Sequence, residues 1–232
     1  GDVEFRIDLE YERVEKRPEG TKPKLPPRSD PADVAALSKA DRLVHDPVAE
    51  GLVSARFTVT VSDQRWKADR VYSVRFAAPD SLTVVESGET PGAADDPVRN
   101  LVELCFGKLV FLRPPAFPDL DDWLVTKNPE EEGTYLLSDR SVTEIDVRLF
   151  GNGALASWKK RLTDPVMTDH SMTFLLVDGK SLLEKSRKPF TKSTLEWTWE
   201  KQAGIRLPRL VLHRHKGRLT RLVATNFEVE HR

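Results

Sequence analysis

The chain has 232 residues and a formal net charge of -1, from 36 Lys and Arg against 37 Asp and Glu. Apolar residues make up 39% of it, which is enough to bury a core in one all-β or α+β domain and more than a disordered chain would hold. The balanced charge argues against a general nucleic-acid binder, which needs a clustered excess of Lys and Arg. No apolar run reaches the roughly 18 residues of a bilayer-spanning helix.

The N-terminal region is expected to hold a strand and a connector. From Val3 to Tyr11, apolar residues alternate with charged ones, a period of two that is typical of a half-buried strand. Residues 16–30 are rich in proline and basic residues, which predicts an extended connector or, as an alternative, a binding arm. We therefore divide the chain into a strand in residues 1–15, a connector at 16–30 and a half-barrel domain over 31–232, to which the strand is expected to belong.

Two helices are predicted, and each begins with an Asp-Pro pair. Asp30-Pro31 begins the first, which runs to about Val44 and is ended by Asp46-Pro47. Asp96-Pro97 begins the second, which we expect Gly107 to close in a left-handed conformation. Between the helices, alternating apolar residues predict strands around 57–61, 72–76 and 82–84.

The stretch from 108 to 133 is expected to contain a strand and a long loop. Residues 108–113, with an apolar run at 109–112, predict a strand that ends at Pro114-Pro115. The loop that follows, up to Gly133, is rich in Pro and Asp and is expected to form one short helical turn. Its apolar residues Trp123 and Leu124 would fold back onto the body, so the loop is a candidate lid.

The C-terminal part of the chain is typical of a strand meander. Turn residues at 151–153, 178–179, 204 and 216–217 separate the strands at hairpin-like intervals, so neighbours should be antiparallel. The predicted strands are 135–138, 143–149, 154–161, 171–177, 181–185, 195–202, 209–216 and 219–229. With about ten or eleven strands, the predicted fold class is mainly β (α+β): one curved antiparallel sheet that forms an incomplete barrel, closed by two short helices and the Pro-rich loop.

Residues with catalytic or metal-binding chemistry are few and scattered. No nucleophile elbow, P-loop, dinucleotide-binding or zinc-protease motif occurs. His213 and His215 would project from one strand face, but the Arg and Lys residues around them oppose a bound cation. His170 lies near Asp164 and Asp169 without an identified nucleophile, and a hydrolase centred on it is kept as an alternative. We expect no catalytic residue, no metal and no cofactor.

Cys105 and the basic stretch from His213 to Arg221 each allow two interpretations. Cys105 is the single cysteine, which excludes an internal disulfide, and its apolar neighbours predict a small buried residue rather than a reactive thiol. The basic stretch gathers cations near one turn. It is typical of a solvated hairpin or, as an alternative, of a surface that attracts phosphate or an anionic membrane.

Large apolar residues alternate cleanly on the late strands. Leu195, Trp197 and Trp199 share one side of a strand, and Phe227 and Val229 repeat the pattern on the last strand. Two helices of about three turns or fewer cover only part of such a face, which leaves apolar area for a ligand. The alternative is that the helices and the 114–133 loop fill the hollow completely.

The element order is a helix at 31–45, then a mid-chain helix with a Pro-rich loop, then a final meander. The meander contains Trp197-x-Trp199, Gly204-Ile205-Arg206-Leu207-Pro208 and Thr225-Asn226-Phe227-Glu228-Val229. Over residues 31–230 the chain resembles the bacterial lipoprotein-sorting proteins LolA and LolB and related half-barrel lipid carriers. The resemblance implies an incomplete barrel that holds acyl chains; the strand at 3–14 and the connector at 16–30 have no counterpart in it.

The resemblance implies an extracytoplasmic protein, periplasmic or a membrane-anchored lipoprotein whose signal segment has been removed. Its expected function is to bind or carry a lipid or lipoprotein acyl chain, or another long apolar ligand, without catalysis. An envelope protein is a second expected partner, and neither nucleic acid nor a transmembrane span is expected. The alternative function is an envelope protein-interaction domain with a filled core. Strand parity assigns the residues that would line the cavity: Phe57, Val59, Tyr72, Val74, Phe76, Phe111, Trp197, Trp199 and Phe227. Trp123 and Leu124 are expected to line it from under the lid.

Overall fold

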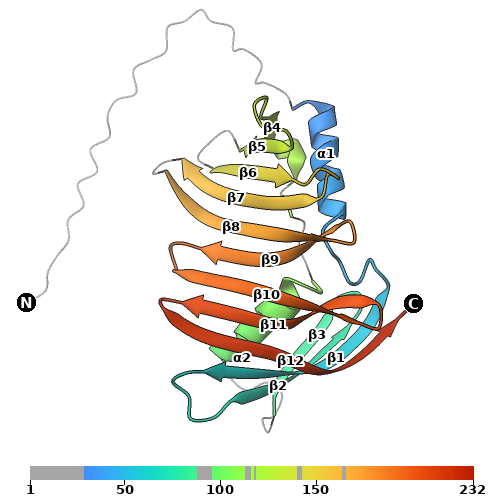
Figure 1. Cartoon of the computed structure of the whole chain (residues 1–232), viewed down its shortest axis with the longest axis vertical. Helices are drawn as coiled ribbons and strands as arrows, with labels where there is room; N and C mark the ends of the chain where they lie inside the picture. The colour runs from blue at the N-terminus through green and yellow to red at the C-terminus, as the bar shows by residue number, and fades with distance from the viewer. Residues whose placement is uncertain (1–28, 88–95, 113–115, 118, 140–142, 164–165) are drawn as a thin grey trace, which may run out of the picture.

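The computed structural model describes residues 29–87, 96–112, 116–117, 119–139, 143–163 and 166–232. Within them lies one sheet of 12 strands in the order β3-β2-β1-β12-β11-β10-β9-β8-β7-β6-β5-β4 (Figure 1). Each strand is antiparallel to its neighbours. Because β3 and β4 lie at opposite edges, the sheet is an open half-barrel, and the predicted fold class is confirmed.

The strands are β1 (Leu52–Asp63), β2 (Arg70–Ala77), β3 (Ser81–Glu86), β4 (Leu124–Lys127), β5 (Thr134–Ser138), β6 (Thr143–Leu149), β7 (Leu155–Thr163), β8 (Val166–Val177), β9 (Lys180–Lys188), β10 (Ser193–Gln202), β11 (Ile205–His215) and β12 (Arg218–His231). The helical segments are α1 (Pro31–Arg42), α2 (Pro97–Val102), the π-helix η1 (Glu103–Lys108) and the 3-10 helix η2 (Leu120–Asp122). No helix in the described part of the chain is both long enough and apolar enough to cross a bilayer.

The hairpins of the meander turn where the sequence predicts them. Asp178 and Gly179 both have positive φ, at 52° and 79°, and Lys216 and Gly217 have φ of 49° and 80°. Two successive residues with positive φ make the turn type whose twist matches that of paired strands. Side chains alternate along the strands that these turns join. One face of the sheet is therefore apolar, and this face lies toward the helices.

Both predicted helix starts are confirmed. Asp30 caps α1 by accepting the backbone N–H of Ala32 at 2.8 Å, and Asp96 caps α2. The face of α1 that contains Leu37 and Ala40 is fully buried. Figure 1 shows α1 beside the β4 to β8 end of the sheet, with α2 at the other end near β10 to β12.

The predictions for Gly107 and for a strand at 108–113 are wrong. Gly107 lies inside η1, its backbone is not left-handed, and a Cβ atom there would collide with the side chain of Leu82. The helical segment ends in tight turns, because the N–H groups of Phe111 and Leu112 bond back to the carbonyl of Gly107. Periodicity cannot separate a short apolar run in a strand from one in a buried helical segment. Here the close packing of Gly107 against Leu82 of β3 favours the helical segment.

The described part of the region expected to be a loop at 114–133 contains regular structure. The single helical turn is confirmed as η2, but β4 follows it and adds an edge strand to the sheet. The described sheet has 12 strands, whereas about ten or eleven were expected. The expected strand at 3–14 and most of the connector at 16–30 lie outside the described residues.

The sheet curls round the segment α2–η1. Phe57 of β1 lies against Phe106 of η1, with ring centroids 5.7 Å apart. On the far side, Trp197 of β10 donates a hydrogen bond to the same segment, although β12 and β11 separate β1 from β10 in the sheet. Strands so far apart can reach one helical segment only if the sheet bends round it.

We expect Gly107→Ala to lower the free energy of unfolding by about 1–3 kcal/mol, because the added methyl group overpacks the contact with Leu82. In a Leu82→Ala background the same change should cost much less. Gly151→Ala is the matched control, since nothing lies within 4 Å of a Cβ there, and its effect should stay within about 0.5 kcal/mol. Urea denaturation of the four variants measures these costs, and equal costs at Gly107 in both backgrounds would contradict the packing account.

Candidate ligand-binding site

The carboxylate of Asp96 anchors α2 to the sheet. It accepts the backbone N–H groups of Val98 at 3.0 Å and Arg99 at 3.2 Å. It also accepts the Tyr72 hydroxyl at 2.8 Å and two guanidinium N–H groups of Arg70, each at 3.0 Å. Burial alone would raise the pKa of Asp96, but the hydrogen bonds from Tyr72, Val98 and Arg70 outweigh it and lower the pKa. The charged carboxylate therefore fixes the start of α2 on β2.

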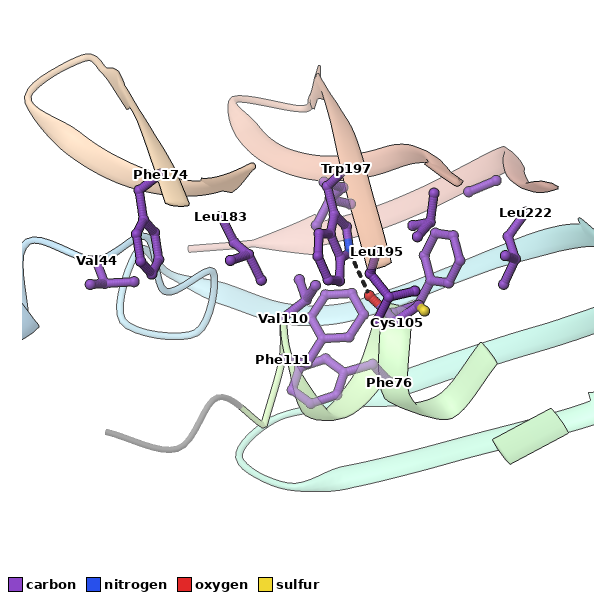
Figure 2. Packing of buried hydrophobic residues seen from close by; sticks show 14 of the residues in the cluster. Val44, Phe76, Cys105, Val110, Phe111, Phe174, Leu183, Leu195, Trp197 and Leu222 are labelled. Carbon is purple, nitrogen blue, oxygen red and sulfur yellow. Dashed lines mark hydrogen bonds between the residues drawn. The ribbon is translucent and has the colours of Figure 1, made fainter. Parts of the chain in front are cut away.

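Trp197 holds η1 from the opposite side. Its indole N–H donates to the backbone carbonyl of Cys105 at 3.1 Å (Figure 2). The Cys105 side chain is fully buried, and burial strongly raises the pKa of its thiol. The prediction of a buried cysteine is confirmed. Together with the Asp96 anchor, this bond sets the height of α2–η1 above the sheet.

The protein's own side chains fill the space between η1 and the strands β1 and β2. Phe57 packs on Phe106, Phe111 and Phe227 with ring centroids 5.7, 6.2 and 5.1 Å away, and Phe76 stacks on Phe111 at 4.6 Å. Figure 2 shows Phe76 and Phe111 beside η1. The predicted lining residues that are buried in this core are Phe57, Val59, Tyr72, Val74, Phe76, Phe111 and Trp197.

The other predicted lining residues, Trp123, Leu124, Trp199 and Phe227, are half-buried. The Trp199 indole N–H donates to the carbonyl of Leu183 at 2.7 Å, and its ring meets the buried His45 edge-on. The carbonyl of Trp123 accepts the Ser29 hydroxyl at 3.1 Å, which ties the start of β4 to the residues before α1. No residue of the predicted set lines the pocket described next, and contact of these residues with a ligand stays a prediction.

A pocket of about 470 Å³ lies between α2–η1 and the strands β8 to β11. It is open to solvent on one side, and most of its surface is apolar. The apolar residues of its wall are Pro97, Leu101, Leu104, Leu109, Met172 and Leu195. The polar residues are Asn100, His170, Ser186, Lys188, Thr191, Ser193, His213 and His215. None of the described residues that line it is acidic, and its volume falls in the range of roughly 300–1,000 Å³ typical of small-molecule sites.

Strand register arranges the sheet side of the pocket in rows. Leu195 pairs with Ser186 and His213, and Ser186 pairs in turn with Met172. One step nearer the strand ends, Ser193 pairs with Lys188 and His215. The exposed Lys188 therefore lies at the rim, whereas Met172 and Leu195 lie further inside.

Two histidines of the pocket are hydrogen-bonded to serines on neighbouring strands. Nε2 of His170 lies 2.8 Å from Oγ of Ser186, and Nε2 of His213 lies 3.0 Å from Oγ of Ser193. Burial lowers the pKa of His170 to about 4, and the nearby cations of Lys188 and Lys160 add to this effect. Burial and His215 also lower the pKa of His213. Both rings are therefore neutral at pH 7.

The expected acid/base centre at His170 is only partly assembled. Asp164 lies outside the described residues, and Asp169 forms an ion pair with Lys160 at 3.5 Å. Ser186 brings a hydroxyl to the ring, but nucleophilic catalysis also needs a group that orients the base. Among the described residues, no hydrogen bond reaches Nδ1 of His170, and its lowered pKa makes the ring a weak base.

The pair His213 and His215 does share one strand face, with ring centroids 5.9 Å apart. A metal site needs further ligands at short distance. In the part of the chain that the structure describes, no cluster of three or more His, Cys, Asp or Glu side chains is arranged to hold a metal ion.

Sequence reasoning did not assign the residues that line the pocket to a ligand site, although it singled out Leu195, His170, His213 and His215 on other grounds. Met172 and Ser186 share the inner face with Leu195, and strand parity together with the register would have placed them there. Leu101 and Leu104 line the pocket from a helical segment whose π-helical part has no sequence signature. The missing information was the register between strands, which parity within each strand does not supply.

Comparisons with known proteins give structural likenesses at low identity. No protein-family model and no curated protein matches the chain. A DUF1329 family protein from Desulfovibrio piger is 14% identical, with 86% of this chain and 92% of that chain covered and a TM-score of 0.34.

Two further solved structures are similar to the chain. A LolA superfamily protein from Nitrosomonas europaea is 10% identical, with 85% and 93% of the two chains covered and a TM-score of 0.31. A domain from Vibrio parahaemolyticus named for outer membrane lipoprotein sorting is 9% identical, with coverage of 86% and 91% and a TM-score of 0.33. The superfamily expected from the sequence is thus among those found, but these values transfer no residue role and no ligand to this chain.

We expect Asp96→Ala to lower the free energy of unfolding by roughly 2–4 kcal/mol, because it removes a helix cap and leaves Arg70 and Tyr72 without their shared acceptor. Asp30→Ala is the matched control, because Asp30 also caps a helix that begins with proline but is exposed. Its cost should be about 1 kcal/mol. Chemical denaturation compares the two, and equal costs would show that Asp96 acts only as a cap.

The lowered pKa of His170 predicts that acid destabilises the fold. Between pH 6.5 and about 4 the unfolded chain binds a proton at this residue that the folded chain does not, so the free energy of unfolding falls as pH falls. After allowance for solvent screening the loss is roughly 1 kcal/mol, and His170→Gln should make the pH profile shallower over this range. An NMR titration of the His170 ring tests the cause directly, and a midpoint at or above 6.5 would be inconsistent with it.

Proposed function

We propose that the protein binds the acyl chain of a lipid, or another long apolar ligand, in the pocket between α2–η1 and β8 to β11, without catalysis. The observation that supports this most is the pocket itself, which has an apolar wall, one open side and a volume of about 470 Å³. Each methylene group that a ligand buries there contributes roughly 0.8 kcal/mol, so a long chain binds well with little shape specificity.

The polar groups of the pocket suit the head of such a ligand. Lys188, Ser193 and His215 lie one row nearer the strand ends than Leu195. A chain that enters with its apolar end first would contact Leu101, Leu104 and Met172 and would leave its polar end at this row. As part of the proposal, the protein acts outside the cytoplasm as a lipid or lipoprotein carrier, in line with the resemblance of its element order to the lipoprotein-sorting proteins.

A protein-interaction domain with a filled core is the second candidate. The packed aromatic side chains around Phe57 favour it for the β1 and β2 part of the sheet. The open pocket over β8 to β11 favours ligand binding for the other part. Because these two parts do not overlap, a filled core at one end does not conflict with a bound ligand at the other.

A lipid-ester hydrolase is the third candidate, and the 2.8 Å separation of His170 and Ser186 is the observation that favours it. The ring lacks an orienting group among the described residues and is a weak base, so we place binding ahead of hydrolysis. If Ser186→Ala abolished turnover of an ester substrate while the variant stayed folded, hydrolysis would take the place of binding as the proposal.

A glutamate in the pocket should weaken ligand binding, because binding would then bury a carboxylate against an acyl chain. We expect Leu104→Glu to raise the dissociation constant of a fluorescent fatty acid at least tenfold, or about 1.4 kcal/mol. Leu175→Glu is the matched control on β8, since Leu104 and Leu175 are exposed to similar degrees, 36% and 42%, but only Leu104 lines the pocket. The proposal would be overturned if the wild-type chain showed no binding of the fatty acid, or if both variants raised the dissociation constant equally.

A further inference from the structure

We propose that one end of the sheet docks on an anionic lipid surface and turns the mouth of the pocket toward the membrane. The docking surface, called the basic tip, is formed by the turns β9–β10 and β11–β12 and the strand ends beside them. Its members are Lys188, Phe190, Lys192, Arg214, Lys216 and Arg218. This inference concerns the outer surface of the protein and goes beyond the ligand proposed for the pocket.

The two turns are physically joined, so the tip is one surface. The backbone N–H of Lys216 donates to the carbonyl of Lys192 at 3.0 Å. In the strands behind them, Ser193 pairs with both Lys188 and His215, and His215 pairs with Arg218. The cations therefore gather at the same end of β9, β10, β11 and β12.

The tip has a local excess of positive charge that the whole chain does not have, since the net charge is -1. Its cations are exposed, and none of them forms an ion pair within the described residues. Among the acidic groups at this end, Asp63 is bound by Arg65 and Asp169 by Lys160, and Asp69 on the β1–β2 connection is exposed. Each cation near an anionic bilayer raises partitioning roughly fivefold.

Phe190 lies among these cations with 55% of its surface exposed. An exposed aromatic ring surrounded by Lys and Arg is unfavourable in water. The same arrangement is favourable in the headgroup region of a membrane, where rings insert and cations meet phosphate. The combination therefore fits a lipid surface better than a purely polar partner, which would have no place for the ring.

The tip also borders the pocket. Lys188 belongs to both, and Thr191 and Ser193, on either side of Lys192, line the pocket. A bilayer seated on the tip would therefore lie at the open side of the pocket, and an apolar chain could pass between them with little exposure to water.

The test is sedimentation of the full chain with vesicles of phosphatidylcholine that contain about 30% phosphatidylglycerol. We expect binding to these vesicles, little binding to pure phosphatidylcholine, and at least a tenfold loss between about 0.05 and 0.5 M salt. The Lys192→Glu/Lys216→Glu variant should lose at least tenfold in partitioning. Lys127→Glu/Lys201→Glu makes the same charge change at exposed lysines outside the tip and should stay within about twofold of the wild type.

Phe190 is tested separately, because charge reversal does not report on insertion. In Phe190→Trp, the added tryptophan should shift its emission to the blue and be quenched by brominated lipid, and Phe190→Ser should weaken binding. Four results would each overturn the proposal. These are no binding to anionic vesicles, equal binding to both vesicle types, an equal loss of binding in the control variant, and binding to a DNA duplex but not to vesicles. Failure of fatty-acid binding in the pocket would leave it standing.

Discussion

The position of α2–η1 depends on one half-buried carboxylate, that of Asp96. It is the point where the helical segment, β2 and the Arg70 guanidinium meet. A charged group in such a place is stable only when all its hydrogen bonds are made, so the start of α2 has little freedom to slide. Trp197 fixes the other end of the segment through the carbonyl of Cys105. Because the pocket is the space left under this segment, these contacts also determine its size.

The inner face of the sheet is used in two ways. Near β1 and β2 it is packed with aromatic rings, which give the curled sheet a rigid centre. Over β8 to β11 the same segment leaves an apolar opening whose sheet side carries neutral histidines bonded to serines. The filled end stabilises the fold, and this allows the other end to stay open. The basic tip lies beyond the open end, so the proposed ligand site and the proposed docking surface share Lys188 and the strand ends around it.

Local patterns in the sequence predicted most of the fold, and long-range packing decided the rest. The Asp-Pro helix starts, the strand alternation of β1, β2 and β3 and of the C-terminal meander, and the glycine turns of that meander are signals within a few residues, and these are confirmed in the described part of the chain. Gly107 was misread because its role is to admit Leu82, which lies on another element. The lining residues of the pocket were not predicted, since Met172 and Leu195 come together only through the register of three strands. Parity alone identified the large aromatic residues, and the structure places most of them in the core.

The central claim is that an apolar chain enters the pocket and lies against the sheet. The chain has 2 methionines, so a spectrum of protein labelled at the methionine methyl groups is simple, and Met172→Leu assigns the signal of the pocket residue. The most direct measurement adds a fatty acid with a spin label at the end of its chain. The account predicts that the Met172 methyl signal is broadened beyond detection, because that group lines the pocket. An unchanged Met172 signal at saturating fatty acid would contradict it.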